Sequence, residues 1–208
     1  FNGFLWSQSV IVEVYAFSVM SFMIVLLCLL RWIYAPHQNR YLYYAMFAFG
    51  ISFTNHQTLI VAAMGIEVAI AAAHFRLGRN LWLGNSIIYV AGLILKSQHK
   101  LTALEANPAI FAIFNVVGIA SIAAYVWFTI LTKESLEEFG RDALLAVTAL
   151  AAAAGPRFGF LAYAISVAAL IGFLWLAWPV RKTQGEWRVM LMSGFCWLLG
   201  ASFYFYMP

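Results

Sequence analysis

Eight apolar segments separated by short polar ones make up most of this chain, and they constrain its fold more than any other feature. Most of them have the length of a membrane-crossing helix, about 17–25 residues, although the second and the sixth are short. They lie approximately at residues 9–30, 41–54, 57–75, 81–96, 108–132, 142–155, 158–180 and 189–207. The pattern predicts an all-α fold: a polytopic bundle of about eight transmembrane helices in a single domain over residues 1–208.

The composition excludes an ordinary soluble domain. Of the 208 residues, 64% are hydrophobic and 10% are charged, whereas soluble domains carry about 25% charged residues. The net charge of +4 does not indicate nucleic-acid binding, because the basic residues are scattered and form no stripe. Cys28 and Cys196 lie in separate apolar segments, without a partner at metal-ligand spacing, so they predict buried apolar side chains rather than a metal site.

The lysines and arginines predict the orientation of the helices. Counted over alternate connections, nine basic residues fall on one side and three on the other, which together account for all 12. Because basic residues concentrate in cytoplasmic connections, the side with nine is predicted to be cytoplasmic. Phe1, Pro208 and the FTNHQT segment at 53–58 are then on the outer side. The cytoplasmic set comprises Arg31, Arg40, Arg76, Arg79, Lys133, Arg141, Arg181, Lys182 and Arg188, and the outer set Lys96, Lys100 and Arg157.

Two connections are predicted to be tight turns that join a short segment to its neighbour. They are FTNHQT at residues 53–58 and GPR at residues 155–157. Asn is a good turn residue, so a turn explains Asn55, but a turn alone does not require His56 and Gln57 beside it. The pattern leaves two interpretations open: a plain solvated turn, or one wall of a binding site.

Two carboxylates lie in or near the apolar segments. Glu13 falls just inside the first segment, with Ser9 and Gln8 four and five residues earlier, roughly on the same helix face, and Glu67 lies midway through the third. A carboxylate at the bilayer centre costs about 2.5–3.5 kcal/mol on insertion scales, so such groups are usually functional. An interfacial Glu13 that reaches water and a structurally paired Glu67 remain the alternatives.

Two stretches of the chain together resemble a known family. The first is FLWSQSVIVEVYAF, which contains Trp6, Ser7, Gln8, Glu13, Val14 and Tyr15, and the second is FGISFTNHQTLIVAAMG, which contains Gly50, Ser52, Asn55 and His56. They resemble motifs of a multi-pass bacterial family related to protein O-mannosyltransferases, which carries a domain of formerly unknown function. That family belongs to the GT-C glycosyltransferase superfamily. The resemblance is clearest over residues 1 to about 75.

The resemblance implies a glycosyltransferase of a bacterial inner membrane. Enzymes of that superfamily move a sugar from a polyprenyl-phosphate donor to an acceptor, here a protein, on the outer face of the membrane. Their main catalytic Asp usually lies in the first outer loop, which would precede Phe1. We therefore expect the chain to be part of a longer protein and to be inactive alone.

The resemblance also implies roles for individual residues. Glu13 corresponds to a second acidic position of the superfamily. His56 stands where relatives often have a Lys, and it could hydrogen-bond to the donor phosphate or, when protonated, neutralise it. Asn55, Gln57, Gln8 and Trp6 are the further candidates for substrate binding. A divalent cation at Glu13 is a further possibility, but one carboxylate with His and Asn makes a poor closed metal site, so no metal ligand is predicted.

Two other functions remain open at this stage. The first is a secondary transporter with Glu13 or Glu67 as its proton-coupling carboxylate, which should show broken helices near the midplane and repeat symmetry. The second is a purely structural membrane module. The glycosyltransferase interpretation instead requires polar groups clustered at the outer rim of the bundle.

Overall fold

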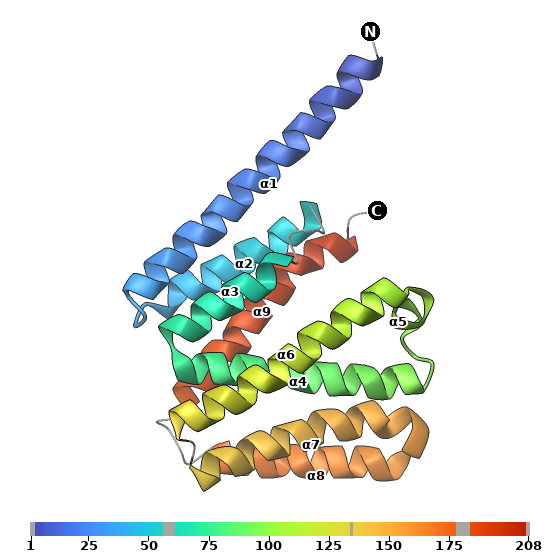
Figure 1. Ribbon diagram of the computed structural model, residues 1–208. Helices are drawn as coiled ribbons and strands as arrows, with labels where there is room; N and C mark the ends of the chain where they lie inside the picture. Colours follow the sequence, from blue (N-terminus) through green and yellow to red (C-terminus); the bar gives the residue numbers. More distant parts are fainter. Residues whose placement is uncertain (1–2, 56–60, 134, 178–183, 207–208) are drawn as a thin grey trace. The chain divides into compact units, whose positions relative to one another are not determined.

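The computed structural model describes residues 3–55, 61–133, 135–177 and 184–206, with side chains at 16–52, 62–102, 104–133, 135–176 and 186–203. The described residues form helices and no strand (Figure 1), which confirms the all-α prediction. One helix lies in each of the eight apolar segments, and the short α5 falls between the fourth and the fifth. In chain order the helices are α1 (Gly3–Tyr34), α2 (Asn39–Asn55), α3 (Val61–Ala73), α4 (Phe75–Ser97), α5 (Thr102–Ala106), α6 (Pro108–Thr132), α7 (Leu136–Phe158), α8 (Phe160–Ala177) and α9 (Gln184–Tyr206).

Among the residues that the structure describes, two helices are long and apolar enough to cross a membrane. They are Ala16–Tyr34 within α1 and Pro108–Thr132, the whole of α6. The shorter apolar stretches are Ala62–Ala73 and Phe160–Leu176. Eight membrane crossings therefore remain a prediction from the sequence.

Helix α6 has the bounds that its sequence predicts. It begins where Asn107 caps it: the Asn107 side-chain oxygen accepts hydrogen bonds from the backbone N–H groups of Ala109 at 3.0 Å and Ile110 at 3.4 Å, and Pro108 occupies the first turn. It ends at Lys133, whose backbone is left-handed with φ +48°. The capping groups at both ends thus set the length of the helix.

The surface of α6 is inverted relative to that of a helix in a soluble protein. Its buried positions are the small residues Gly118 and Ser121, and the Ser121 hydroxyl donates to the Val117 carbonyl at 2.7 Å. Its large apolar side chains point outward, so this helix suits an apolar surrounding better than water. The exposed ones are Ile110, Ile113, Val116, Ile119, Ile122, Val126, Trp127, Ile130 and Leu131.

Two helices begin earlier than their hydrophobicity predicts. The fourth apolar segment was expected to begin at residue 81, but α4 begins at Phe75, with His74 alone between it and α3. The sixth was expected to begin at 142, but α7 begins at Leu136. The first turns of both helices contain charged residues. The prediction followed hydropathy and therefore assigned these residues to connections. Their charges are accommodated by partners within the fold, as described below.

The predicted turn at residues 155–157 is wrong by a few residues. Helix α7 continues through Gly155 and Pro156 and ends at Phe158, and Gly159 makes the turn. Gly159 has φ +63°, a left-handed backbone that glycine adopts without strain, and its N–H donates to the Gly155 carbonyl at 2.8 Å. At FTNHQT, Phe53 to Asn55 belong to α2, which ends at Asn55, and the rest of the predicted turn lies outside the described residues.

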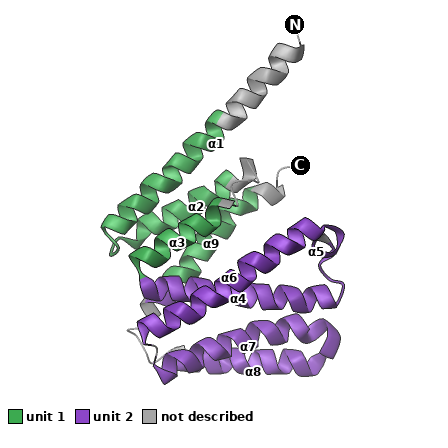
Figure 2. Cartoon of the chain, viewed as in Figure 1, with its two compact units in different colours: residues 1–74, 188–208 green, residues 75–187 purple. Residues whose placement is uncertain are grey.

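The helices group into two compact units (Figure 2). Unit 1 contains residues 1–74 and 188–208, and unit 2 contains residues 75–187. The first unit is therefore built from α1, α2, α3 and most of α9, and the second from α4 to α8 with the first turn of α9. The single domain over residues 1–208 stays a prediction from the sequence.

In unit 1, α2 and α9 cross in backbone contact at two glycines. A Cβ built on Gly50 would meet the Trp197 carbonyl oxygen and the Ala201 nitrogen, and one built on Gly200 would meet the Phe47 carbonyl oxygen. Only glycine permits such an approach, and small residues serve this purpose where helices pack in membranes.

In unit 2, aromatic rings fill the space beside glycines on neighbouring helices. The Tyr89 ring of α4 lies where a Cβ on Gly118 of α6 would be, and its hydroxyl donates to Asn115 Oδ1 at 2.9 Å. Helices α7 and α8 are joined similarly, because the Tyr163 ring packs against Gly155. The hydrogen bond between Tyr89 and Asn115 thus joins α4 to α6 within the unit.

The α2–α9 crossing predicts different effects for two glycines of the same helix. Gly200→Ala should lower the free energy of unfolding by about 1–3 kcal/mol, because the methyl group meets backbone that cannot yield. Gly194→Ala in α9 is the matched control: no atom lies within 4 Å of its Cβ position, so it should be neutral or slightly stabilising through helix propensity. Thermal unfolding in detergent measures both, and equal effects would contradict the crossing.

Candidate functional site

The residues proposed from the sequence lie on α1 and at the end of α2. Trp6, Gln8 and Glu13 are all within α1, and Asn55 is the last residue of α2. The side chains of these four residues lie outside the described part of the structure, as do His56 and Gln57 altogether. The convergence of these groups at the outer rim therefore stays a prediction.

The uninterrupted α1 does fix their helical register. Trp6 precedes Glu13 by seven residues, which is close to two turns, so the two positions share one side of the helix. Ser9 lies about one turn before Glu13, whereas Gln8 lies about 140° around the axis from it. Ser9 and Trp6 therefore share the side of Glu13 more closely than Gln8 does.

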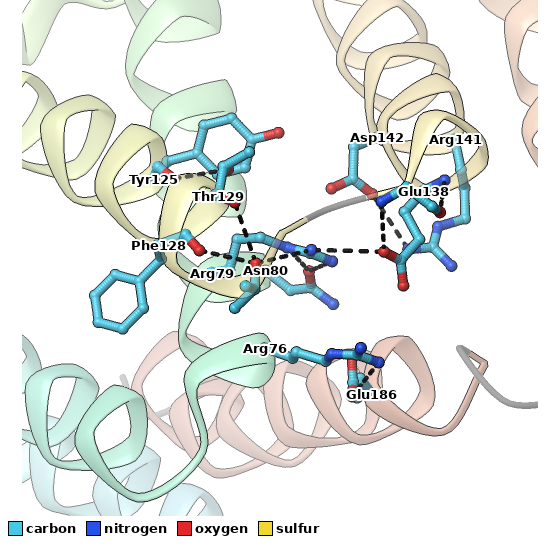
Figure 3. Close-up of polar contacts among 12 residues, drawn as sticks. Arg76, Arg79, Asn80, Tyr125, Phe128, Thr129, Glu138, Arg141, Asp142 and Glu186 are labelled. Atoms are coloured by element: carbon cyan, nitrogen blue, oxygen red, sulfur yellow. Dashed lines mark hydrogen bonds and ion pairs between the residues drawn. The ribbon is translucent and has the colours of Figure 1, made fainter.

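The largest group of buried charges lies elsewhere, in unit 2, and the sequence did not predict it (Figure 3). We call it the charge cluster. Its side chains come from the first two turns of α4 and of α7, and each residue is at most 9% exposed. Its members are Arg79, Asn80, Glu138, Arg141 and Asp142.

A capping box at the start of α7 brings Glu138 into the cluster. The Ser135 hydroxyl oxygen accepts a hydrogen bond from the Glu138 N–H, and the Glu138 carboxylate accepts one from the Ser135 N–H, both at 3.2 Å. This reciprocal pair fixes where α7 begins. The sequence Ser135-Leu-Glu-Glu138 matches the S-x-x-E pattern, so the signal for an earlier helix start was present although hydropathy concealed it.

Arg79 is the centre of the cluster and is fully buried. Its Nε and Nη2 both donate to Asn80 Oδ1, at 3.3 and 3.2 Å, so the planar guanidinium holds the neighbouring amide with two hydrogen bonds. Its Nη1 donates to Thr132 Oγ1 in the last turn of α6 at 3.4 Å and lies 4.0 Å from Glu138 Oε2. One side chain of α4 thereby joins the end of α6 to the start of α7.

A second pair and a ring contact extend the cluster. Arg141 Nη2 lies 3.5 Å from Asp142 Oδ1, and the Arg141 guanidinium carbon lies 5.7 Å from the centroid of the Trp187 ring. That ring meets Phe173 edge-on at 6.0 Å. At the more exposed edge, Arg76 Nη1 lies 3.9 Å from Glu186 Oε1.

The contacts of the charge cluster indicate a structural role. Its two arginines are balanced by two carboxylates, and a buried charge is tolerated only when such partners compensate its lost hydration. None of its side chains is open enough to meet a substrate. Among the residues that the structure describes, no group of three or more His, Cys, Asp or Glu side chains could hold a metal ion.

Glu67, which the sequence singled out, and the polar residues between α4 and α6 make contacts of their own. Glu67 is half-buried within α3 and has an interaction partner. At the opposite end of unit 2, the exposed His99 Nδ1 contacts Glu105 Oε1 at 2.9 Å, and Gln98 donates to the Ala153 carbonyl at 3.1 Å. The contacts of His99 and Gln98 hold the polar connection between α4 and α6 in place.

The cluster predicts a large loss of stability when one partner is removed. Arg79→Ala should lower the free energy of unfolding by about 3–5 kcal/mol, because Glu138 would remain buried without its cation. Chemical unfolding of the purified protein in detergent measures this. Glu137→Gln is the matched control, since this neighbouring carboxylate is exposed and its neutralisation should change the free energy by less than about 0.5 kcal/mol. An Arg79→Ala protein as stable as the control would contradict the role assigned to the cluster.

The N-terminal part of the chain is similar to a known protein family. Residues 1–79 match the family model described as the protein O-mannosyl-transferase TMEM260 N-terminal domain. The match includes both motifs that carried the resemblance, at Trp6 to Tyr15 and Gly50 to His56. No curated protein and no solved structure matches the chain.

Proposed function

We propose that this chain is part of a membrane-embedded glycosyltransferase that moves a mannose-like sugar from a polyprenyl-phosphate donor to a protein acceptor. The observation that carries the proposal is the family match over residues 1–79, whose name is that of a protein O-mannosyltransferase domain. The inverted surface of α6 and the apolar stretch Ala16–Tyr34 support a location in the membrane. In this proposal every helix except the short α5 is a membrane span, and GT-C enzymes of bacterial inner membranes are the functional analogy.

The proposed reaction takes place at the outer membrane surface, where Glu13 and the residues around His56 would meet. A lipid-linked donor presents its phosphate at headgroup depth, and the bond between that phosphate and the sugar breaks as the acceptor hydroxyl attacks. His56 would hydrogen-bond to the phosphate and, when protonated, neutralise the charge that the leaving group gains. Glu13 would orient the acceptor or a basic partner, with Trp6, Asn55 and Gln57 completing the wall of the site, whereas the register of α1 turns Gln8 away from Glu13.

The residues available do not by themselves make a closed metal site. If a divalent ion is bound, Glu13 is the carboxylate of this chain that would contact it. Such an ion would stabilise the charge of the phosphate. The proposed roles of His56 and Asn55 do not depend on it.

Substitutions in the full-length protein test the proposed site. Glu13→Gln and His56→Ala should each reduce sugar transfer by about 100-fold or more, the usual contribution of a positioned acid–base or charge-stabilising group. Transfer of a labelled sugar from the polyprenyl-phosphate donor to protein is the measurement, with membrane insertion checked in parallel.

Two residues provide matched controls for this test. Glu137→Gln and His37→Ala change the same residue types at exposed positions outside both motifs, and both should retain normal transfer. If Glu13→Gln and His56→Ala also turned over normally, the site would be wrong. A loss of proton-coupled uptake in Glu67→Gln would then favour a transporter.

A further inference from the structure

The connection between α1 and α2 carries two arginines that share one aromatic ring. Arg31 lies in the last turn of α1 and Arg40 in the first turn of α2. Their guanidinium carbons lie 5.7 and 5.1 Å from the centroid of the Tyr41 ring. Both side chains are exposed, so two cations are held close together at one surface.

The hairpin itself is well ordered by contacts of its own. Trp32 is buried, and its Nε1–H donates to Asn39 Oδ1 at 3.4 Å, which joins the end of α1 to the first residue of α2. Backbone hydrogen bonds from Gln38 N to the Ala35 carbonyl at 2.9 Å and from Tyr41 N to the Gln38 carbonyl at 3.1 Å form the turn. The two arginines therefore extend from a connection whose backbone is held by hydrogen bonds.

Among the described residues, no carboxylate pairs with these two arginines. The sequence contains no Asp or Glu between Glu13 and Glu67, and neither Arg31 nor Arg40 forms an ion pair with a described residue. By contrast, Arg76, Arg79 and Arg141 each lie within 4.0 Å of a carboxylate oxygen. The positive charge of the hairpin is thus left to an external partner.

The position of the pair along α1 indicates what that partner is. The apolar stretch Ala16–Tyr34 ends three residues after Arg31. Tyr34 and Tyr44 are 86% and 57% exposed, and Tyr44 meets the Tyr41 ring edge-on at 6.4 Å. Exposed tyrosines beside the end of an apolar helix are typical of the membrane–water interface, where the lipid phosphates lie.

We propose that Arg31 and Arg40 bind the phosphate of an anionic glycerophospholipid at this end of α1. A guanidinium matches phosphate oxygens with paired hydrogen bonds, and stacking on an aromatic ring keeps it oriented while its N–H groups remain available. The exposed tyrosines would contact the glycerol and acyl region of the same lipid. The proposal rests on the membrane insertion assumed in the proposed function and not on sugar transfer.

Native mass spectrometry of the full-length protein with added phosphatidylglycerol tests the proposal. The double variant R31Q/R40Q should bind this lipid about 30-fold more weakly, and each single variant about fivefold, if each arginine contributes the usual interaction of one basic residue at a membrane surface. Arg157→Gln is the matched control: Arg157 is exposed and lies 5.7 Å from the Phe158 ring centroid, but as a single stacked cation. It should change binding less than twofold.

Two further binding measurements, with phosphatidylcholine and with inorganic phosphate, identify the ligand. Phosphatidylcholine, whose headgroup has no net charge, should bind equally to parent and double variant, and millimolar inorganic phosphate should not displace phosphatidylglycerol. Unchanged phosphatidylglycerol binding in R31Q/R40Q, or an equal loss in Arg157→Gln, would overturn the proposal, as would displacement by free phosphate. If the double variant unfolds, the two single variants decide the same question. A failed transfer assay would leave this result intact, because lipid binding requires no catalysis.

Discussion

The exposure of large apolar side chains on α6, together with the burial of small residues on that helix and of charges in unit 2, is the constraint on which the rest of this structure depends. On α6, Gly118 and Ser121 face the packed interior while isoleucines and a tryptophan are exposed. In an apolar surrounding the hydrophobic effect does not drive helices together, so close packing and satisfied polar groups must hold them. The glycines that admit Tyr89 and Tyr163 provide the packing in unit 2, and the Gly50–Gly200 contact provides it in unit 1.

The charge cluster is the polar counterpart of that packing. Arg79 reaches an amide on its own helix, a hydroxyl on α6 and a carboxylate on α7, so a single side chain fixes three helix ends at once. Such a group is useful only when every charge has a partner, because an unmatched buried ion would cost several kcal/mol. The exposed pair at Arg31 and Arg40 is the opposite case: two cations without carboxylates, at the place where α1 leaves its apolar stretch.

Hydrophobic pattern predicted most of the helices, and local capping chemistry explains where it failed. The bounds of α6 were predicted because apolar character and the capping groups Asn107 and Lys133 coincide there. At α4 and α7 the helices begin within charged sequence, so hydropathy placed Arg79 and Arg141 in connections although both are buried. Burial depends on partners that are distant in sequence, and a single sequence does not reveal them. The candidate site at Glu13 and His56 came from motif resemblance, and the family match over residues 1–79 supports that relationship while the geometry of the site stays a prediction.

Accessibility across α6 tests most directly whether this fold is embedded in a membrane. With Cys28 and Cys196 replaced by alanine, His99→Cys and Glu137→Cys place one thiol before and one after the helix, both at exposed positions. A membrane-impermeant maleimide should label position 99 in intact cells and position 137 only after lysis. Reversed labelling would retain the span but contradict the orientation. Equal labelling of both positions in intact cells, or of neither until lysis, would contradict a membrane-spanning α6 and with it the central claim.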